Sequence, residues 1–170
     1  MQTKTPRISV VIPTFQEGRY LAKVLSRLAE TKHPIEIVIV DSGSKDNTVK
    51  IAKQSTDKVY LIREQGISKA KNYGAQKASR EILVFLDADV KPSADFVDKV
   101  VETFNDAVVV GATCHIVPEH PNLGETLFFH FYNLLIQVCS KFKPHSRGEF
   151  LAVRRKSFLA VGGFDETMPC

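Results

Sequence analysis

The chain has 170 residues, of which 44% are hydrophobic and 25% are charged, a balance typical of a globular domain rather than a disordered segment. The net charge of +4 comes from scattered basic residues, which argues against a nucleic-acid-binding function. Three cysteines without metal-ligand spacing (Cys114, Cys139 and Cys170) and no signal-peptide pattern favour a cytoplasmic protein, in solution or at the cytoplasmic face of the membrane.

Short apolar runs alternate with segments of helical periodicity along the chain. The sequence predicts strands at 8–12, 35–40, 58–62, 82–86, 107–117 and 149–155. Helices are predicted around 20–28, after the turn that begins at 41, and at 67–78, 96–104 and 123–142. This alternation, with strands that are apolar throughout, predicts an α/β fold: a Rossmann-like, mostly parallel central sheet with helices on both faces.

Three polar segments follow predicted strands: "PTFQEG" (13–18), "DSGSKDNT" (41–48) and "DADV" (87–90). Right-handed crossovers place the carboxyl ends of parallel strands at one edge of the sheet, where open α/β sheets bind ligands. The three segments are therefore expected to form one site. Neither a Gly-x-Gly-x-x-Gly pattern nor a phosphate-binding P-loop is present, so this site binds through carboxylates rather than a glycine-rich loop.

Asp87 and Asp89 are separated by one residue at the end of a strand, so both carboxylates lie on one face of the chain. Such a pair suits a hard divalent cation, Mg²⁺ or Mn²⁺, which carboxylates bind together with substrate phosphate oxygens. The alternative is a turn or helix cap. Asp89 is too early to cap the next predicted helix, and Ser93 can serve that role.

Asp41 ends the second predicted strand, where its carboxylate can accept a hydrogen bond from a base N–H. Alternatively, the polar residues of 41–48 form a turn and cap the following helix, which accounts better for Asp46 and Asn47. Glu17 is either a ligand-binding acid or a first-turn helix charge.

Four segments together resemble the inverting family 2 glycosyltransferases of the GT-A fold. They are "VVIPTFQEGRYLAKVLSRL", "IEIVIVDSGSKDNT", "GISKAKNYGAQKASREILVFLDADVKP" and "GEFLAVRRKSFLAVGGFDE", in that order. The resemblance covers about residues 7–166. It implies a single GT-A domain over residues 1–170, truncated on its C-terminal side.

The resemblance implies a set of nucleotide-sugar contacts and a metal ligand. The nucleotide contacts are Pro13, Thr14, Phe15, Glu17, Asp41, Gly66, Lys71, Asn72, Asp87 and Ala88. Within this set Asp41 pairs with the base, typically uracil, and Asp87 lies near the ribose. Asp89 of the Asp-x-Asp motif binds the metal that bridges to the diphosphate. Lys71 stands in place of the usual arginine and keeps the charge without the planar fork, while Ser42 replaces a second acid.

On the acceptor side, the resemblance places Arg154, Gly162, Gly163 and Asp165 in the pocket wall. The general base of such enzymes usually follows "GGFDE" by several residues, so we expect it beyond Cys170, with Asp165 as the fallback. Alternatively, the acceptor is an already ionised lipid phosphate that needs no base. An aromatic cluster in 128–135 would suit a lipid, or else forms core packing or a dimer contact. The basic run 154–156 contacts diphosphate or lipid head groups, or is an exposed turn.

The resemblance therefore implies a glycosyltransferase that depends on Mg²⁺ or Mn²⁺. It would transfer a sugar with inversion from a nucleoside-diphosphate sugar, UDP-type favoured, to a glycan or lipid-phosphate acceptor. Peripheral membrane association and a homodimer are compatible with the sequence. A different class of function is a catalytically incomplete nucleotide-sugar-binding module, or a fragment, that lacks the catalytic general base. A nucleotidyltransferase is disfavoured, because "PTFQEGRYL" (13–21) lacks the glycine-rich basic loop of those enzymes.

Overall fold

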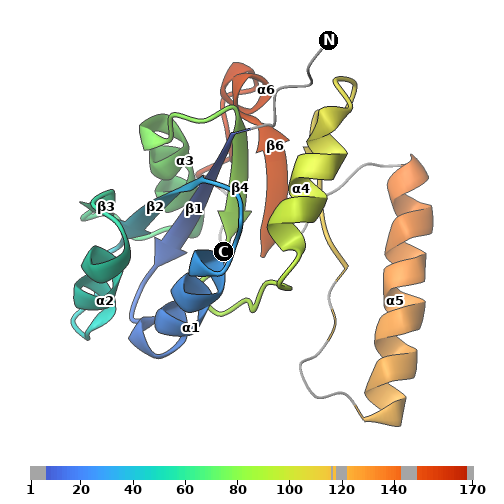
Figure 1. Cartoon of the computed structure of the whole chain (residues 1–170), viewed down its shortest axis with the longest axis horizontal. Helices are drawn as coiled ribbons and strands as arrows, with labels where there is room; N and C mark the ends of the chain where they lie inside the picture. Colours follow the sequence, from blue (N-terminus) through green and yellow to red (C-terminus); the bar gives the residue numbers. More distant parts are fainter. Residues whose placement is uncertain (1–6, 116, 118–121, 143–148, 168–170) are drawn as a thin grey trace.

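The structure, a computed structural model, describes residues 7–115, 117, 122–142 and 149–167 (Figure 1). The strands are β1 (Ile8–Thr14), β2 (Ile35–Asp41), β3 (Val59–Leu61), β4 (Ile82–Leu86), β5 (Gly111–Ala112) and β6 (Phe150–Arg154). The helices are α1 (Gly18–Ala29), α2 (Thr48–Ser55), α3 (Ile67–Lys77), α4 (Phe96–Asn105), α5 (Leu123–Phe142) and α6 (Arg155–Ala160). The predicted α/β class is confirmed.

The strands form one sheet in the order β3-β2-β1-β4-β6-β5. Strands β1 to β4 are parallel, and β6 runs antiparallel to β4. The chain leaves β1 toward β2 on one side and later returns to β4 on the other side (Figure 1). Such a reversal opens a crevice between the carboxyl ends of the two central strands. The crevice lies between Thr14, at the end of β1, and Asp87, which follows β4.

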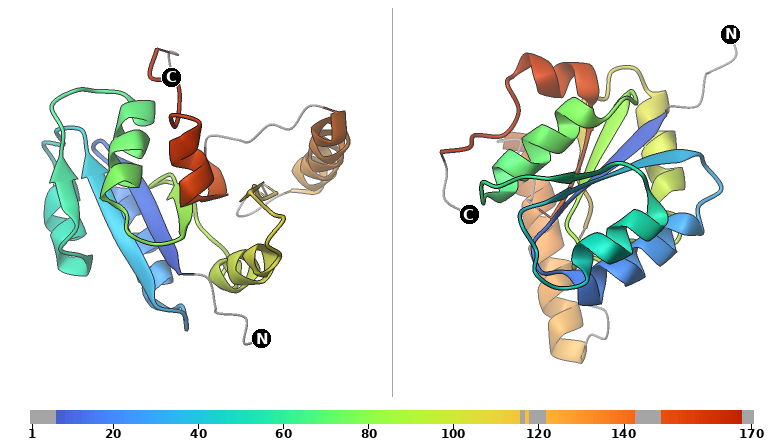
Figure 2. Two further views of the ribbon diagram at one scale, coloured as in Figure 1. Left: turned by 90° about the horizontal axis from the view of Figure 1, so that it is seen from above. Right: turned by 90° about the vertical axis from the view of Figure 1, so that its left-hand side faces the viewer.

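Alternate residues of the central strands pack against helices on opposite faces of the sheet. Val10 and Ile12 of β1 face α1, α2 and α4, whereas Val11 between them faces α3 and α6 (Figure 2). All three side chains are fully buried. Burial on both faces explains why these strands are apolar without alternation, and it holds the loops at their carboxyl ends in place.

Helix α3 lies close to the sheet because its inner face consists of small residues. A Cβ atom at Gly74 would lie 2.3 Å from Cγ1 of Val11 and 3.2 Å from Cγ2 of Val40. Ala70 and Ala75 are buried on the same side of the helix. This close approach brings the first turn of α3 to the carboxyl ends of β1 and β4.

Three local predictions were wrong. The strand expected at 107–117 is limited to Gly111–Ala112, and Val108 is 84% exposed; residue 116 lies outside the described part. For the basic run 154–156, the turn alternative is wrong, because helix α6 begins at Arg155. Helix α4 begins at Phe96 with Asp95 in the N-cap position, so Ser93 lies outside the helix and donates to Asp95 Oδ1 at 2.7 Å.

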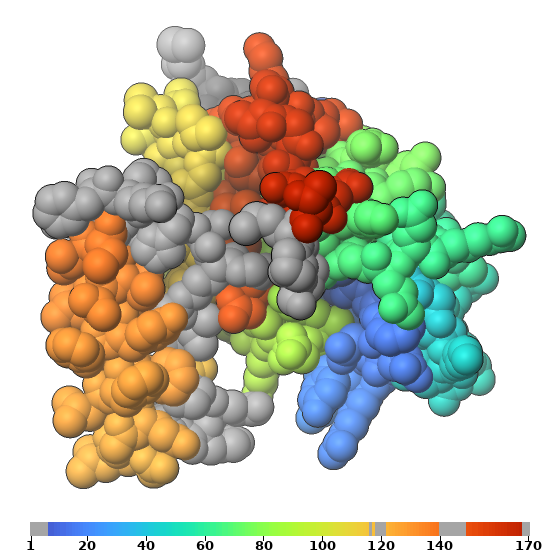
Figure 3. Space-filling model, turned by 180° about the vertical axis from the view of Figure 1, so that it is seen from behind, coloured from blue at the N-terminus to red at the C-terminus, as the bar shows by residue number. Residues whose placement is uncertain are grey.

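Helix α5 stands beside the sheet rather than in its core (Figures 1 and 3). Most of its large apolar side chains are exposed, with Leu127 at 72% and Phe131 at 63%, whereas Phe129 and Ile136 are half-buried. The core-packing explanation of the aromatic cluster is therefore wrong. No helix in the described ranges is both long enough and apolar enough to cross a membrane.

Candidate functional site

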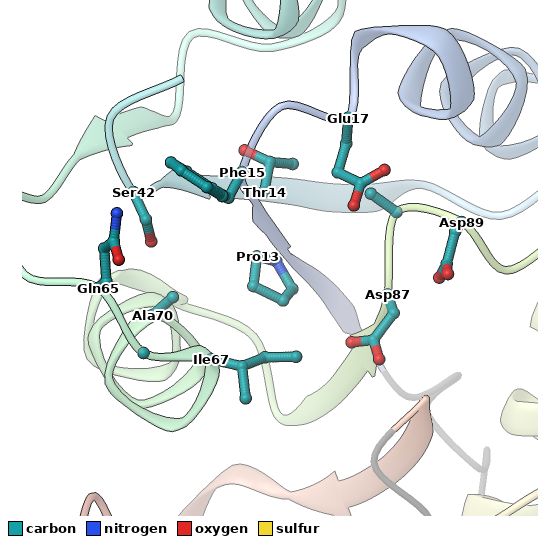
Figure 4. Close-up of a pocket in the computed structure, with 12 residues that line it drawn as sticks. Pro13, Thr14, Phe15, Glu17, Ser42, Gln65, Ile67, Ala70, Asp87 and Asp89 are labelled. Atoms are coloured by element: carbon teal, nitrogen blue, oxygen red, sulfur yellow. The ribbon is translucent and has the colours of Figure 1, made fainter. Parts of the chain in front are cut away.

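A cavity of about 370 Å³ opens at the crevice between the carboxyl ends of β1 and β4 (Figure 4). Twelve of the described residues line it: Pro13, Thr14, Phe15, Glu17, Ser42, Gln65, Gly66, Ile67, Ala70, Asp87, Ala88 and Asp89. The polar segments after β1 and β4 meet here, as the strand alternation predicts. From the segment after β2, only Ser42 reaches the cavity.

Sequence reasoning did not assign four of the lining residues to the site. Ser42 was noted only as a departure from the family pattern, Ile67 and Ala70 only as part of one face of the predicted helix 67–78, and Gln65 was not singled out. Gln65 follows β3 and comes directly before Gly66, which the resemblance had implicated. The rule that led to the other polar segments, a position after the carboxyl end of a parallel strand, also applies to Gln65.

One end of the cavity carries three carboxylates, those of Glu17, Asp87 and Asp89 (Figure 4). The pKa of Glu17 is raised by burial and by the negative charges of Asp89, Asp46 and Asp87. Like charges held together in this way favour a bound cation. Within the described ranges, no three His, Cys, Asp or Glu side chains form a metal-binding group by themselves. The donor set fits a hard cation that takes one or two carboxylates and completes its shell with substrate oxygens.

Asp87 is paired with a lysine from the neighbouring helix. Lys71 Nζ lies 2.7 Å from Asp87 Oδ1, and the lysine is only 3% exposed. Burial raises the pKa of Asp87, while Lys71 opposes this shift. Glu149 adds a further negative charge, and its carbonyl oxygen accepts from the Asp87 N–H at 3.1 Å. Lys71 is therefore a buried counter-ion behind the cavity wall.

Asp41 lies under the cavity, fully buried, and does not line it. Its Oδ2 accepts from the hydroxyls of Thr14 at 2.9 Å and Ser44 at 2.6 Å. Its Oδ1 accepts from the backbone N–H groups of Gly43 at 3.0 Å and Ser44 at 2.8 Å. The carboxylate thus connects the end of β1 with the loop after β2.

Further hydrogen bonds join the same two loops. The Gln16 N–H donates to Ser44 Oγ at 2.7 Å, and the Gly18 N–H donates to Asp46 Oδ2 at 3.1 Å. Asp46 also accepts from the Thr48 N–H at 3.0 Å, which confirms its expected turn role. Gln16 adopts a φ of 57°, a strained conformation for a residue with a side chain. The loop that carries Phe15 and Glu17 is therefore held in one conformation.

Asn72 also lies outside the cavity lining, on the other side of α3. Its Nδ2 donates to Phe164 O at 2.9 Å and to Glu166 Oε1 at 2.8 Å, and its Oδ1 accepts from the Phe164 N–H at 2.8 Å. The Asn72 side-chain amide thus binds the 162–166 segment to α3. Asn72 is thus placed to position this segment rather than to contact a ligand in the cavity.

Asp165 is exposed and is not among the cavity-lining residues. Its Oδ1 accepts from the Thr167 hydroxyl at 2.6 Å and from the Thr167 N–H at 2.8 Å. These hydrogen bonds lower the pKa of Asp165. A lowered pKa makes a carboxylate a weaker proton acceptor, so this geometry favours Asp165 as a turn residue.

Arg154 is not part of the wall of this site, and its expected place was wrong. Because β6 is antiparallel to β4, Arg154 pairs with Ile82 at the opposite end of β4 from Asp87. Its guanidinium donates to the carbonyl oxygens of Phe104 and Asp106 at 3.1 and 2.9 Å, next to the end of α4. Arg154 therefore caps the carboxyl end of α4 and does not line the cavity.

Residues 9–162 match the family described as Glycosyl transferase family 2. The chain is 31% identical to glycosyltransferase AglE of Haloferax volcanii, over 96% of this chain and 58% of that protein. It is also 31% identical to the dolichol-phosphate mannosyltransferase of Pyrococcus furiosus, over 76% of this chain and 38% of that protein.

A similar solved structure is the mannosyltransferase PcManGT of Pyrobaculum calidifontis in complex with GDP-Man and Mn²⁺. It has a TM-score of 0.79 and 28% identity, over 98% of this chain and 49% of that chain. A structure of Staphylococcus aureus TarS, at 18% identity and a TM-score of 0.75, shares the fold. The chain thus spans about half the length of these proteins. The family match covers nearly all of the chain, the neighbours have the GT-A fold, and the chain belongs to glycosyl transferase family 2.

Proposed function

We propose that the cavity binds a nucleoside-diphosphate sugar together with Mg²⁺ or Mn²⁺, and that the enzyme transfers the sugar with inversion. The observation that carries this proposal is the division of the cavity into two ends. Three carboxylates lie at one end, and the uncharged Ser42 and Gln65 lie at the other (Figure 4). A nucleoside diphosphate bound to a cation has the same division, with a neutral base at one end and a metal-bound diphosphate at the other.

Asp89 is the proposed metal ligand. Asp87 already has the Lys71 ammonium at 2.7 Å, so its charge is partly compensated without a cation. Asp89 is exposed at the rim and lines the same end of the cavity. A bound Mg²⁺ or Mn²⁺ would neutralise charge on the departing nucleoside diphosphate. The neighbour PcManGT, solved with GDP-Man and Mn²⁺, supports this assignment by analogy.

Asp87 is the proposed ribose contact, since the fixed lysine behind it holds the carboxylate in one position. Pro13 and Ile67 line the intervening apolar part of the cavity (Figure 4). In the transfer itself, an acceptor oxygen attacks the anomeric carbon from the face opposite the diphosphate. The bond to the diphosphate oxygen breaks, and its electron pair leaves with the nucleotide.

The acceptor is proposed to be a glycan or a lipid phosphate. Relatives named for dolichol phosphate, such as the Pyrococcus furiosus enzyme, make a lipid phosphate a reasonable candidate. An ionised phosphate would attack without a general base. The exposed aromatic residues of α5 would suit a lipid chain or a second subunit.

A second candidate function is a donor-binding module that is catalytically incomplete. It is favoured by the position of Asp165, which lies outside the cavity lining and has a lowered pKa. Sugar transfer by this 170-residue chain to a glycan or lipid-phosphate acceptor would exclude that candidate.

Calorimetric titration of the chain with UDP and with GDP, in the presence and absence of Mn²⁺, tests the donor proposal. We expect Mn²⁺ to strengthen the binding of at least one nucleotide by roughly tenfold or more, with UDP favoured, because the carboxylate end otherwise repels a diphosphate. Binding of neither nucleotide, or binding that is independent of Mn²⁺, would contradict the proposal.

A further inference from the structure

We propose that helix α5 is an interface between two copies of this chain. The interface consists of one line of exposed apolar side chains, termed here the α5 seam: Leu123, Leu127, Phe131, Leu134 and Val138. The proposal concerns assembly, so it goes beyond the proposed function. It does not depend on what the donor cavity binds.

The α5 seam lies on the side of the helix that faces away from the rest of the chain. Helix α5 stands at the edge of the molecule (Figures 1 and 3). Its half-buried residues mark the side that faces the protein: Phe129, Tyr132, Asn133 and Ile136. With 3.6 residues per turn, the seam positions fall on the opposite side. Their exposed fractions run from 46% at Val138 to 89% at Leu123, so this apolar face is open to a partner.

The area of the seam matches what a dimer needs. At roughly 200 Å² for one large apolar side chain, the exposed parts of the five residues amount to roughly 650 Å². Monomeric proteins rarely expose a continuous apolar patch larger than a few hundred Å². Two seams packed together would bury about 1,300 Å², which lies within the range of about 1,200 to 2,000 Å² for specific interfaces.

The spacing of the seam favours a helix as the partner. Successive intervals of four, three and four residues separate Leu127, Phe131, Leu134 and Val138. This spacing keeps apolar side chains in one line along a pair of helices that cross at about 20°. A second α5 presents the same line, and a twofold axis then brings apolar residues opposite apolar residues whether the helices run parallel or antiparallel.

The charges of α5 favour a second copy over an anionic membrane. Residues 123–139 contain no lysine or arginine, and Glu125 is their only acid. Helices that lie on a membrane surface typically carry lysine and arginine on the polar face, where they meet anionic head groups. The centres of protein interfaces are instead poor in charge and rich in aromatic residues. A net charge of +4 on 170 residues gives little repulsion between two copies.

The seam and the donor cavity belong to different elements. No described residue of α5 is among those that line the cavity. Substitutions in the seam therefore leave the cavity lining intact, and self-association can be measured without a nucleotide or a metal.

Sedimentation equilibrium of the 170-residue chain, over protein concentrations of roughly 1 to 100 µM, tests the proposal. We expect the mass to rise with concentration toward twice the 19.0 kDa of one chain. The double variant Phe131→Glu/Leu134→Glu should weaken association by at least about tenfold, because it would bury charge against an apolar partner. Phe131→Ala/Leu134→Ala, which retains helix-forming residues, should weaken association in the same direction.

Leu61→Glu is the matched control. Leu61 lies in β3 and is 63% exposed, as Phe131 is, so the variant introduces the same charge at an equally exposed apolar residue outside α5. It should associate as the wild type does. Far-UV circular dichroism of every variant should match that of the wild type, because the substituted side chains are exposed.

A charge exchange separates pairing from general damage to the helix. Phe131→Glu/Leu134→Glu and Phe131→Lys/Leu134→Lys should each be monomeric alone. Mixed in equal amounts, they should form a heterodimer, because opposite charges then face each other in a parallel or an antiparallel pair. A mixture that remains monomeric would contradict pairing through the seam.

Three other results would overturn the proposal. The first is a wild type that stays monomeric over the whole concentration range. The second is a dimer that persists unchanged in Phe131→Glu/Leu134→Glu, which would place the interface elsewhere. The third is a monomeric wild type that sediments with vesicles of phosphatidylcholine and phosphatidylglycerol and loses this binding in the same variant. That result would assign the seam to a membrane surface.

Discussion

Lys71 of α3 and Asp87, which follows β4, form a buried ion pair with 2.7 Å between Nζ and Oδ1. The Lys71 ammonium also lies 6.0 Å from the centre of the Phe164 ring. One lysine thus contacts the wall of the proposed donor site on one side and the 162–166 segment on the other. Asn72, the next residue of α3, fixes that segment through three hydrogen bonds.

Replacement of Lys71 by methionine should destabilise the fold. It leaves the half-buried Asp87 carboxylate without its counter-charge, and removing one partner of a buried pair typically costs about 3 kcal/mol. Urea unfolding of the wild type and the variant measures this difference. The double variant Lys71→Met/Asp87→Asn should recover most of the loss, since no charge is then buried. A double variant that loses the sum of the two single effects would show that the residues do not interact.

The two glycines before Phe164 should differ in their tolerance of alanine. Both adopt a positive φ, 86° at Gly162 and 83° at Gly163, so both substitutions carry backbone strain of about 1 kcal/mol. A Cβ at Gly163 would also lie 2.5 Å from Asn72 Oδ1, whereas Gly162 has open space around it. We expect Gly163→Ala to be more destabilising than Gly162→Ala by about 1 to 2 kcal/mol. Hydrogen exchange at the Phe164 amide should become faster in Gly163→Ala and stay unchanged in Gly162→Ala. Equal exchange rates in the two variants would contradict the role of Asn72 in holding the 162–166 segment.

Glu36 should contribute to the acid sensitivity of the protein. Burial alone would raise its pKa, but hydrogen bonds from Lys58, Ser9 and Ser79 outweigh burial and lower the pKa to about 2 from 4.5. A carboxyl with a lowered folded-state pKa stabilises the protein above about pH 4.5, and this stabilisation is lost as the pH falls toward 2. The shift corresponds to about 3 kcal/mol at neutral pH.

Denaturant titrations at several pH values between 2 and 6 test this assignment. Glu36→Gln should reduce stability at pH 6 and flatten the decline toward acid, because the group that titrates is gone. The exposed Glu102→Gln is the matched control and should follow the wild-type profile. An undiminished acid slope in Glu36→Gln would show that other groups cause it.

The sequence predicts the sheet and the location of the site because both follow from strand order. Buried strands alternate with helices, so the segments after β1 and β4 had to meet at one edge. The direction of individual side chains does not follow in this way. Hydrogen bonds turn Asp41 and Asn72 away from the cavity: those of Asp41 run to Thr14 and to its own following loop, and those of Asn72 run to Phe164 and Glu166. Thr14 and the 162–166 segment become neighbours of these residues only in the folded chain.

Arg154 illustrates a second limit of sequence reasoning. The apolar run of β6 indicates a strand but not its direction, and an antiparallel strand places its last residue at the far end of the sheet. The segment before α5 shows a third limit. Apolar residues at 107–117 resemble a strand, yet among the described residues of this segment only Gly111 and Ala112 pair with β6.

The most direct test of the central claim is the effect of Mn²⁺ on UDP affinity in the wild type and in Asp89→Asn. If Asp89 holds the cation beside the diphosphate, Mn²⁺ should strengthen binding by roughly tenfold or more in the wild type and have little effect in the variant. Asp57→Asn, which removes the same charge from an exposed position away from the cavity, should behave as the wild type does. An Asp89→Asn variant that keeps the full Mn²⁺ effect would contradict the account.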